Sequence, residues 1–244
     1  MKIVGILCEY NPLHLGHAKQ ISMIRKFSGP ETAVVCLMSG NFVQRGHPAV
    51  FDKMTRAAAA MEAGADLVLE LPVQYCLSSA EGFAAGAVSI LGTFCDEMSF
   101  GAEHPDPEDL MAVARALLSR AFPGHLRRHL DQGLSFPVAR ARALADMGAP
   151  AGLVASPNDI LAVEYCKAIL DQGCAMRPAP IHREGSYHNA EADPENPSAT
   201  SLRTLIEEGK PFRSFVPTDL FEDAPVHTLA FGERAMLARL RTMM

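Results

Sequence analysis

Short apolar runs alternate with helical patterns along the first part of this chain, and this alternation constrains the fold more than any other feature. Runs of this kind, rich in β-branched residues, are typical of strands buried on both faces of a parallel sheet. The strand candidates are residues 3–7, 32–38, 65–72, 96–100 and 174–182. Helical periodicity fills the intervals at 17–27, 52–63 and 79–91. Because parallel neighbours need crossover helices, the alternation predicts an α/β fold with a doubly wound, mainly parallel sheet.

The pattern becomes helical after Pro105. Apolar stripes separated by Pro or Gly predict helices at 107–121, 124–132, 136–147 and 158–172. A polar, turn-rich loop is expected at 185–197, then a helix near Ser198, and a last helix from Glu233. We therefore predict an α/β core, a helical subdomain, a return to the core and a C-terminal tail, at residues 1–104, 105–173, 174–214 and 215–244.

Composition excludes several classes of protein. With 244 residues, 48% of them apolar, the chain can bury a sizeable core. The longest nearly uncharged apolar stretch, 83–94, is too short to cross a bilayer, and the first residues lack the features of a signal peptide, so we expect a cytoplasmic protein that does not bind membranes. The six cysteines are scattered without a Cys-x-x-Cys pair, which argues against structural zinc and against a disulfide framework.

The first predicted strand-to-helix turn carries two histidines. It reads CEYNPLHLGH, with His14 and His17 on either side of Gly16. In an open α/β sheet, ligands bind beyond the carboxyl ends of the strands, and this turn is the usual phosphate site. If Leu15 opens the helix, both imidazoles lie on one side of its first turn, where the backbone amides and the helix dipole favour an anion. The glycine lets a nucleotide approach the backbone.

Two other interpretations of this turn stay open at the level of the sequence. His14 can cap the helix while His17 lies at the surface, since His-x-Gly-His also occurs by chance. A metal site is the third interpretation, but two histidines need further ligands that this spacing does not supply, and we predict no protein-held metal.

The stretch SATSLR, residues 198–203, is a candidate for a second anion contact. It places three hydroxyls at a helix start with Arg203 in the first turn, an arrangement that suits a phosphate. An ordinary serine cap with a solvent-facing arginine has the same sequence. We expect His104, His125 and His129 to be surface residues, and Met54 and Met61 to belong to a helical core.

Seven stretches together resemble one family. In chain order they are CEYNPLHLGH, GNFVQRGHPAVFDKMTRAAAA, GADLVLELP, MSFGAE, SPNDILAVEY, the Arg183/Gly185/Tyr187/His188 stretch and SATSLR. As an ordered set, spanning residues 2–206, they resemble the motifs of the tRNA(Met) cytidine acetate ligase family, an HxGH-type branch of the nucleotidyltransferase superfamily with a Rossmann-like fold. Members of that family usually run well beyond 244 residues, so we expect this chain to lack the family's C-terminal part.

The resemblance implies an ATP-dependent RNA-modifying ligase. It would activate acetate as acetyl-adenylate and pass the acetyl group to N4 of the wobble cytidine of elongator tRNA(Met), releasing pyrophosphate and AMP. Its implied catalytic residues are His14, His17 and Arg203. The implied ATP-binding residues are Glu9, Tyr10, Asn11, Pro12, Gly16, Gly101, Asn158, Arg183 and Ser201. The implied substrate loop holds Asn41, Gln44 and Arg45, and Mg²⁺ is expected to bind mainly through the nucleotide phosphates.

The distribution of charge bears on the acceptor. The chain as a whole carries a formal net charge of −6, but residues 115–142 contain six arginines and a single acid. This segment is therefore a candidate tRNA-binding surface. The arginines are Arg115, Arg120, Arg127, Arg128, Arg140 and Arg142. The alternative function is a small-molecule adenylyltransferase that transfers AMP to a phosphorylated cofactor precursor and needs no such surface. A non-enzymatic RNA-binding or nucleotide-binding module is a third possibility, which the pair of histidines disfavours.

Overall fold

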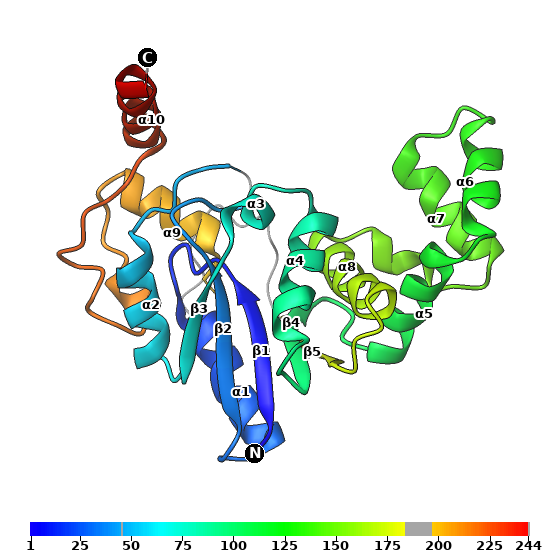
Figure 1. The fold of residues 1–244 in the computed structure, drawn as a ribbon, viewed down its shortest axis with the longest axis horizontal. Coiled ribbons are helices and arrows are strands. Elements are labelled where there is room, and N and C mark those ends of the chain that lie inside the picture. The colour runs from blue at the N-terminus through cyan, green and yellow to red at the C-terminus, as the bar shows by residue number, and fades with distance from the viewer. Residues whose placement is uncertain (45, 184–196, 244) are drawn as a thin grey trace. The chain divides into compact units, whose positions relative to one another are not determined.

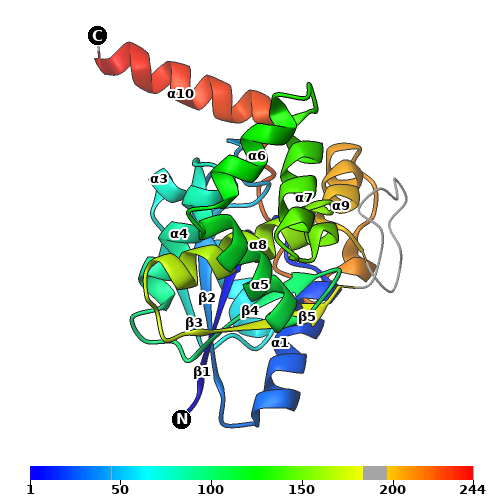
Figure 2. The same cartoon turned by 90° about the vertical axis from the view of Figure 1, so that its right-hand side faces the viewer.

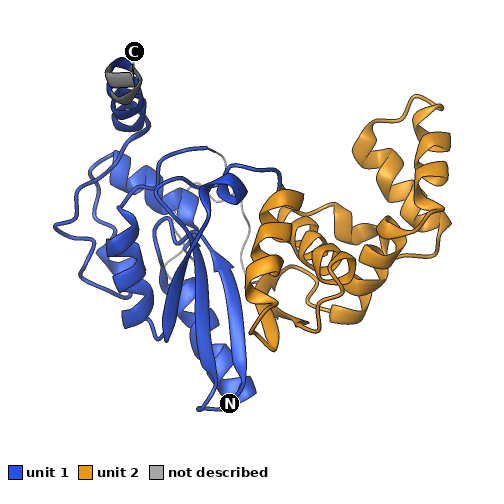
Figure 3. Ribbon diagram, in the orientation of Figure 1, with its two compact units in different colours: residues 1–79, 185–244 blue, residues 80–184 orange. Residues whose placement is uncertain are grey.

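The computed structural model describes residues 1–44, 46–183 and 197–243, which form two compact units (Figures 1 and 3). The first unit contains residues 1–79 and 185–244, and the second contains residues 80–184. Arg45 and the loop predicted at 185–197, apart from Pro197, lie outside the described residues.

The first unit is built on three parallel strands in the order β3-β2-β1. They are β1 (Ile3–Cys8), β2 (Ala33–Ser39) and β3 (Leu67–Leu71), and the crossover helices are α1 (Leu15–Ser28) and α2 (Lys53–Glu62). The three strands and both helices confirm the predicted alternation. The expectation of a strand buried on both faces is wrong for β3, where Leu67 and Glu70 are exposed, because this strand ends the order and has a partner on one side.

The rest of the first unit comes from the C-terminal part of the chain and from one short helix after β3. These elements are α3 (Val73–Cys76), α9 (Ala199–Glu207), the 3₁₀ helix η2 (Arg213–Phe215) and α10 (Leu229–Met243). The helix predicted near Ser198 is confirmed, and the last helix begins at Leu229 rather than at Glu233. Phe51 stacks on Phe221 with ring centroids 4.7 Å apart, so the C-terminal segment contributes to the core of this unit.

The second unit contains a parallel strand pair and the predicted helices. β4 (Glu97–Ala102) pairs with β5 (Arg177–His182), and α8 (Pro157–Asp171) packs on α4 (Ala80–Leu91) and on α5 (Pro107–Leu118). The 3₁₀ helix η1 (Ala151–Val154) precedes α8. Figure 2 shows α6 (Phe122–Leu130) and α7 (Phe136–Asp146) side by side as a helical pair.

Two expectations about burial are wrong. His129 is buried between α6 and α7, where its Nε2 lies 2.8 Å from Asp146 Oδ2. Met54 and Met61 are exposed to 70% and 46%, because the buried face of α2 is formed by Arg56, Ala59 and Ala60 instead. The unit boundary near residue 80 groups α4 and β4 with the helices that follow them, whereas the sequence-based boundaries at 104, 173 and 214 stay predictions.

No helix in the described part of the chain combines the length and the apolar character needed to span a bilayer.

Candidate functional site

The turn after β1 places His14 at the N-terminus of α1. His14 is the N-cap residue, and its Nδ1 accepts a hydrogen bond of 3.1 Å from the backbone N–H of Gly16. His17 reciprocates, because its Nδ1 accepts from the backbone N–H of His14 at 3.3 Å. In this capping box, two imidazoles take the places that Ser or Thr and Glu or Gln usually hold. His14 does cap the helix, as one interpretation of the sequence held, but capping uses only one nitrogen of each ring.

Capping fixes the tautomer of both rings. A ring nitrogen that accepts a hydrogen bond carries no hydrogen, so each neutral imidazole holds its hydrogen on Nε2. The two rings stack with their centroids 3.7 Å apart, and the ring of Tyr10 lies 4.9 Å from that of His17. His14 is 4% exposed. The turn therefore holds a stacked pair of imidazoles at a helix N-terminus that favours an anion, and the Nε2 atom of His14 is buried.

Gly16 has a second role that the sequence did not indicate. A Cβ atom at this position would lie 3.0 Å from Cε1 and 3.2 Å from Nδ1 of His14. These distances are tighter than ordinary van der Waals contact, so a side chain at this position would require the His14 ring to shift by a few tenths of an ångström. The glycine thus leaves room for the imidazole in addition to leaving the backbone open.

The chain before His14 is fixed by buried side chains. Tyr10 has a left-handed backbone (φ 45°) and is buried, with its hydroxyl 3.4 Å from Cys36 Sγ on β2. The peptide bond between Asn11 and Pro12 is cis. Asn11 is buried as well, and its Oδ1 accepts from the backbone N–H of Val50 at 2.8 Å. Tyr10 and Asn11 therefore position the turn.

Arg203 lies at this same turn. Its Nη1 donates to the backbone carbonyl of Asn11 at 2.9 Å, a contact between residues 192 positions apart in the sequence, and its Nη2 donates to Thr200 Oγ1 at 3.0 Å. The fold thus brings His14, His17 and Arg203 into one unit.

Ser201 is engaged in the cap of α9. Ser198 is the N-cap residue, and its Oγ accepts from the backbone N–H of Ser201 at 3.0 Å. The Ser201 hydroxyl is buried and donates to the Ser198 carbonyl at 2.9 Å. The serine-cap interpretation is therefore confirmed for Ser198, while Arg203 contacts the turn after β1.

The predicted substrate loop follows β2. Glu9 Oε1 accepts from the backbone N–H of Gln44 at 2.8 Å, which ties this loop to the end of β1. Asn41 is exposed, and its carbonyl accepts from the backbone N–H of Ala49 at 2.9 Å. The Glu9 carboxylate thus binds the backbone of this loop, whereas the resemblance implies a contact between Glu9 and ATP.

Arg56 is a residue that the sequence analysis did not single out. Its side chain is fully buried on α2, and it donates to three backbone carbonyls: Nη1 to Glu9, Nη2 to Gly40 and Nε to Phe51. Burial lowers the pKa of this guanidinium below its usual range. The sequence signal that could have identified Arg56 is an arginine on the apolar face of a helix otherwise rich in alanine. Arg56 joins the loops that follow β1 and β2.

The second unit brings together three of the predicted ATP-binding residues. Arg183 Nη1 donates to Asn158 Oδ1 at 3.0 Å. A Cβ atom at Gly101 would lie 3.6 Å from both Cβ and Cδ of Arg183, so the arginine stem packs against the end of β4. Asn158 stands in the first turn of α8, but Ser156 is the N-cap residue, so Asn158 does not cap this helix.

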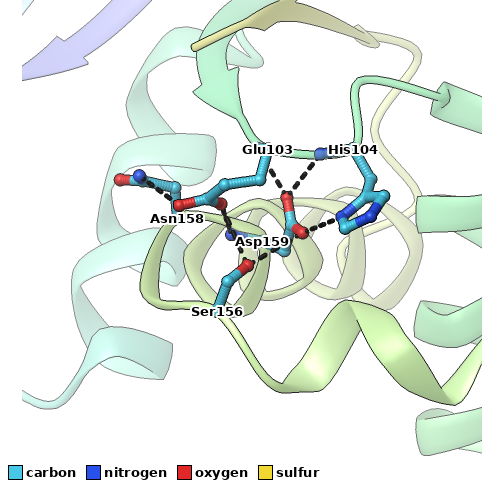
Figure 4. Close-up of polar contacts among 5 residues, drawn as sticks. All are labelled: Glu103, His104, Ser156, Asn158 and Asp159. Carbon is cyan, nitrogen blue, oxygen red and sulfur yellow. Dashed lines mark hydrogen bonds and ion pairs between the residues drawn. The ribbon is translucent and has the colours of Figure 1, made fainter. Parts of the chain in front are cut away.

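Two acids that the sequence analysis did not assign organise this region (Figure 4). Glu103 Oε1 accepts from Asn158 Nδ2 at 2.6 Å, and Glu103 Oε2 accepts from the backbone N–H of Asp159 at 3.0 Å. Asp159 is fully buried and its Oδ1 accepts from the backbone N–H groups of Glu103 and His104, at 2.8 and 3.0 Å. His104 Nδ1 lies 2.6 Å from Asp159 Oδ2. These contacts fasten the loop after β4 to the N-terminus of α8.

The predicted tRNA-binding arginines all lie in the helical part of the second unit. Arg127 and Arg128 on α6 have side chains that are 79% and 61% exposed. Arg140 is half-buried, donates to the carbonyl of Val154 at 3.1 Å and lies over the exposed ring of Phe136. The other three are exposed: Arg115, Arg120 and Arg142.

All six cysteines are free thiols. Burial raises the pKa of both Cys95 and Cys166 to about 12, so these two stay protonated at neutral pH. A protonated thiol is a poor nucleophile, and neither residue is suited to covalent catalysis.

Comparisons with known proteins agree with this geometry. A family model described as HIGH Nucleotidyl Transferase matches residues 1–236. A curated relative from Clostridium novyi, named tRNA(Met) cytidine acetate ligase, is 41% identical over 219 residues, which are 86% of this chain and 54% of that protein. A relative of the same name from Acetivibrio thermocellus is 40% identical over 84% of this chain and 52% of that protein.

Two solved structures of Thermotoga maritima TmcAL are also similar. The form bound with alpha-thio ATP is 38% identical with a TM-score of 0.78, and covers 91% of this chain and 55% of that chain. The apo form is 37% identical with a TM-score of 0.82, and the match covers 91% of this chain and 56% of that chain. The predicted fold class, a doubly wound α/β nucleotidyltransferase fold, is confirmed, and so is the resemblance to tRNA(Met) cytidine acetate ligases.

The matches cover most of this chain but only part of each relative. The chain spans about half the length of the curated relatives it matches, since it covers 54% and 52% of the two named above. The family model, in contrast, runs through nearly all of the described residues. On that match, the chain belongs to the HIGH nucleotidyl transferase family.

Proposed function

We propose that this chain is an ATP-dependent ligase that activates acetate as acetyl-adenylate and acetylates N4 of the wobble cytidine of elongator tRNA(Met). The observation that carries the proposal is the pair of capped imidazoles, His14 and His17, at the N-terminus of α1. Similarity to a TmcAL structure bound with alpha-thio ATP supports a nucleotide as the ligand of this region. A tRNA substrate implies a cytoplasmic location for the proposed enzyme.

In the first half-reaction, a carboxylate oxygen of acetate attacks the α-phosphorus of ATP. A P–O bond forms to acetate, and the bond to pyrophosphate breaks with its electron pair leaving on pyrophosphate. Acetate is a weak nucleophile, so the site has to neutralise charge on the attacked phosphate and on the leaving group. The Nε2–H groups of His14 and His17 supply donors for this charge, and Arg203, held at the same turn, adds a cation. Mg²⁺ would accompany the nucleotide, held mainly by its phosphates.

The remaining nucleotide contacts fall to two groups of residues. In the first unit they are the turn residues Glu9, Tyr10, Asn11, Pro12 and Gly16, with Ser201 at the start of α9. In the second unit, Gly101, Asn158 and Arg183 form the group described above. Because Asn11, Tyr10 and Glu9 direct their side chains to protein partners, we assign their part of the contact to the backbone.

In the second half-reaction, the cytidine N4 amine attacks the acyl carbon of acetyl-adenylate. The new C–N bond forms, the bond to the phosphate oxygen of AMP breaks, and the amine loses one proton. The loop with Asn41, Gln44 and Arg45 follows β2 and is a candidate for meeting acetate or the cytidine. The exposed arginines of α5 to α7 supply positive charge for the phosphate backbone of the tRNA.

Pyrophosphate release from ATP tests the proposal. We expect release that depends on acetate, and transfer of labelled acetyl groups to tRNA(Met) when the tRNA is added. Release that depends instead on a phosphorylated cofactor precursor would identify a small-molecule adenylyltransferase. Absence of release with acetate and with every precursor, at saturating ATP, would contradict an enzymatic role.

A further inference from the structure

We infer that Glu103 is a positioning residue for nucleotide binding, which sets the orientation of the Asn158 amide and, through it, of the Arg183 guanidinium. This inference rests on the proposed function, in which Asn158 and Arg183 bind ATP. Its basis is a chain of contacts within the second unit. Glu103 Oε1 accepts from Asn158 Nδ2 at 2.6 Å, and Asn158 Oδ1 accepts from Arg183 Nη1 at 3.0 Å.

The carboxylate decides which way the Asn158 amide points. A carboxylate can only accept hydrogen bonds, so the Asn158 NH₂ group must face Glu103. The amide oxygen then faces the opposite way, where the guanidinium of Arg183, which can only donate, requires an acceptor. Because an amide has one end of each kind, the acceptor at Glu103 and the donor at Arg183 together select a single orientation of Asn158.

Glu103 is itself held rigidly enough to act in this way. Its Oε2 accepts from the backbone N–H of Asp159 at 3.0 Å, and the Asp159 carboxylate accepts in return from the backbone N–H of Glu103 at 2.8 Å. Ser156 Oγ lies 3.0 Å from Glu103 Oε2 and 2.9 Å from Asp159 Oδ2. Asp159 is fully buried. Figure 4 shows Asn158 at one side of this network and His104 at the other.

The substitution Glu103→Gln tests the inference because it changes one acceptor into a donor at nearly constant shape. If the new NH₂ group faces Asp159, two donors meet at the N-terminus of α8. If it faces Asn158, that amide has to turn over and set its own NH₂ against Arg183. The second arrangement reverses the Asn158 amide, and in the first the two facing donors repel each other and displace the side chain that orients Asn158. We therefore expect the affinity for ATP to fall about tenfold, with a rise in KM for ATP and little change in kcat.

A double-mutant cycle on the full 244-residue chain separates positioning from a general effect on folding. ATP binding is measured by calorimetry for wild type, Glu103→Gln, Asn158→Ala and the double variant. If Glu103 acts through Asn158, its substitution should matter in the wild-type background and change affinity less than about twofold in the Asn158→Ala background. Glu97→Gln is the matched control, since it removes a carboxylate at the start of β4 that pairs with Arg177 at 3.0 Å, and it should leave ATP affinity unchanged.

Two results would overturn the inference while leaving the nucleotide site in place. One is an unchanged ATP affinity in Glu103→Gln when Asn158→Ala weakens binding. The other is a Glu103→Gln effect of the same size in both backgrounds, which would indicate a structural role only. If the wild-type chain bound no ATP, the proposed function itself would fail. Should Glu103→Gln not fold, Glu103→Asp enters the same cycle with the same expected coupling.

Discussion

At the scale of single residues, one group often serves structure and chemistry together. His14 and His17 cap α1 through Nδ1, and the proposed function assigns the Nε2–H groups of the same two rings to a phosphate. An alanine variant therefore removes the helix cap and the proposed ligand contact at once. Variants that retain the cap are therefore needed to separate them.

We expect His14→Ala and His17→Ala to lower acetate-dependent pyrophosphate release by a factor of about 10² to 10³, the usual cost of removing one donor from a developing charge. His14→Ala also loses the N-cap, which typically costs about 1 kcal/mol of folding free energy. His14→Asn and His17→Gln replace the imidazoles by residues that commonly form a capping box, so these variants should keep the folding stability of the wild type and still lose the activity. Normal turnover in these two variants would show that the imidazoles serve only the helix.

His104 offers a residue-scale prediction on pH. The hydrogen bond and ion pair with buried Asp159, with a smaller contribution from Glu103, raise the pKa of His104 above its ordinary value of 6.5. The interaction should therefore stabilise the fold fully below that ordinary value, and its contribution should disappear as the pH rises through the raised folded-state pKa. The pKa of Asp159 is lowered, so at the acid end stability is lost only as the pH falls through that lowered value.

Urea unfolding of wild type and His104→Gln measures this dependence. We expect wild type to be the more stable of the two at about pH 5.5, and the difference to shrink as the pH rises through the raised pKa of His104. An NMR titration of the His104 ring checks the direction of the pKa shift directly. A difference in stability that grew with pH would have the wrong sign for this ion pair.

At the scale of elements, α2 does more than connect β2 to β3. Arg56 reaches from its buried face to the carbonyls of Glu9, Gly40 and Phe51, so one helix side chain sets the loops after two strands. The same feature makes α2 sensitive to substitution. A buried carbonyl that loses its donor has no water to replace it.

We expect Arg56→Leu to lower the free energy of unfolding by about 3 kcal/mol or more, because each buried polar group left without a partner costs about 1–3 kcal/mol. Arg56→Lys keeps the charge, but a single ammonium cannot reach three separate carbonyls, so it should recover only part of the loss. Arg25→Leu is the control. Arg25 also donates to three backbone carbonyls and to Asp66, but its side chain is 31% exposed, and water can replace its bonds. Equal losses in Arg56→Leu and Arg25→Leu would contradict the importance of burial.

At the scale of the whole molecule, the two units carry different parts of the proposed reaction. The residues proposed to bind phosphate, His14, His17 and Arg203, belong to the first unit, and the arginine-rich helices belong to the second. Arg127 and Arg128 are exposed candidates for contact with the tRNA backbone, although each also lies near a carboxylate, that of Asp131 and of Asp146 respectively.

Arg127→Glu combined with Arg128→Glu should weaken tRNA binding and leave ATP binding unchanged. For every arginine–phosphate interaction that the substitutions remove, the slope of log affinity against log salt should flatten by about one unit or slightly less. Filter binding across a salt series gives the slope, and Arg177→Glu, an exposed arginine on β5 of the same unit, is the control. An unchanged slope would rule out this surface, and a parallel loss of ATP binding would show that the substitutions disturb the fold.

The sequence by itself determined the features that depend on neighbours along the chain. Strand and helix periodicities placed most elements within a few residues, and the turn CEYNPLHLGH and the helix start SATSLR stood out as candidate anion sites because caps and turns are local. Tertiary structure decided the rest. The contact of Arg203 with Asn11 spans 192 positions, Arg56 reaches two strand ends, and the exposure of β3 follows from its place in the strand order. Periodicity repeats over a few residues and reports which face is buried, whereas the partner of a buried polar group is chosen by packing between distant segments.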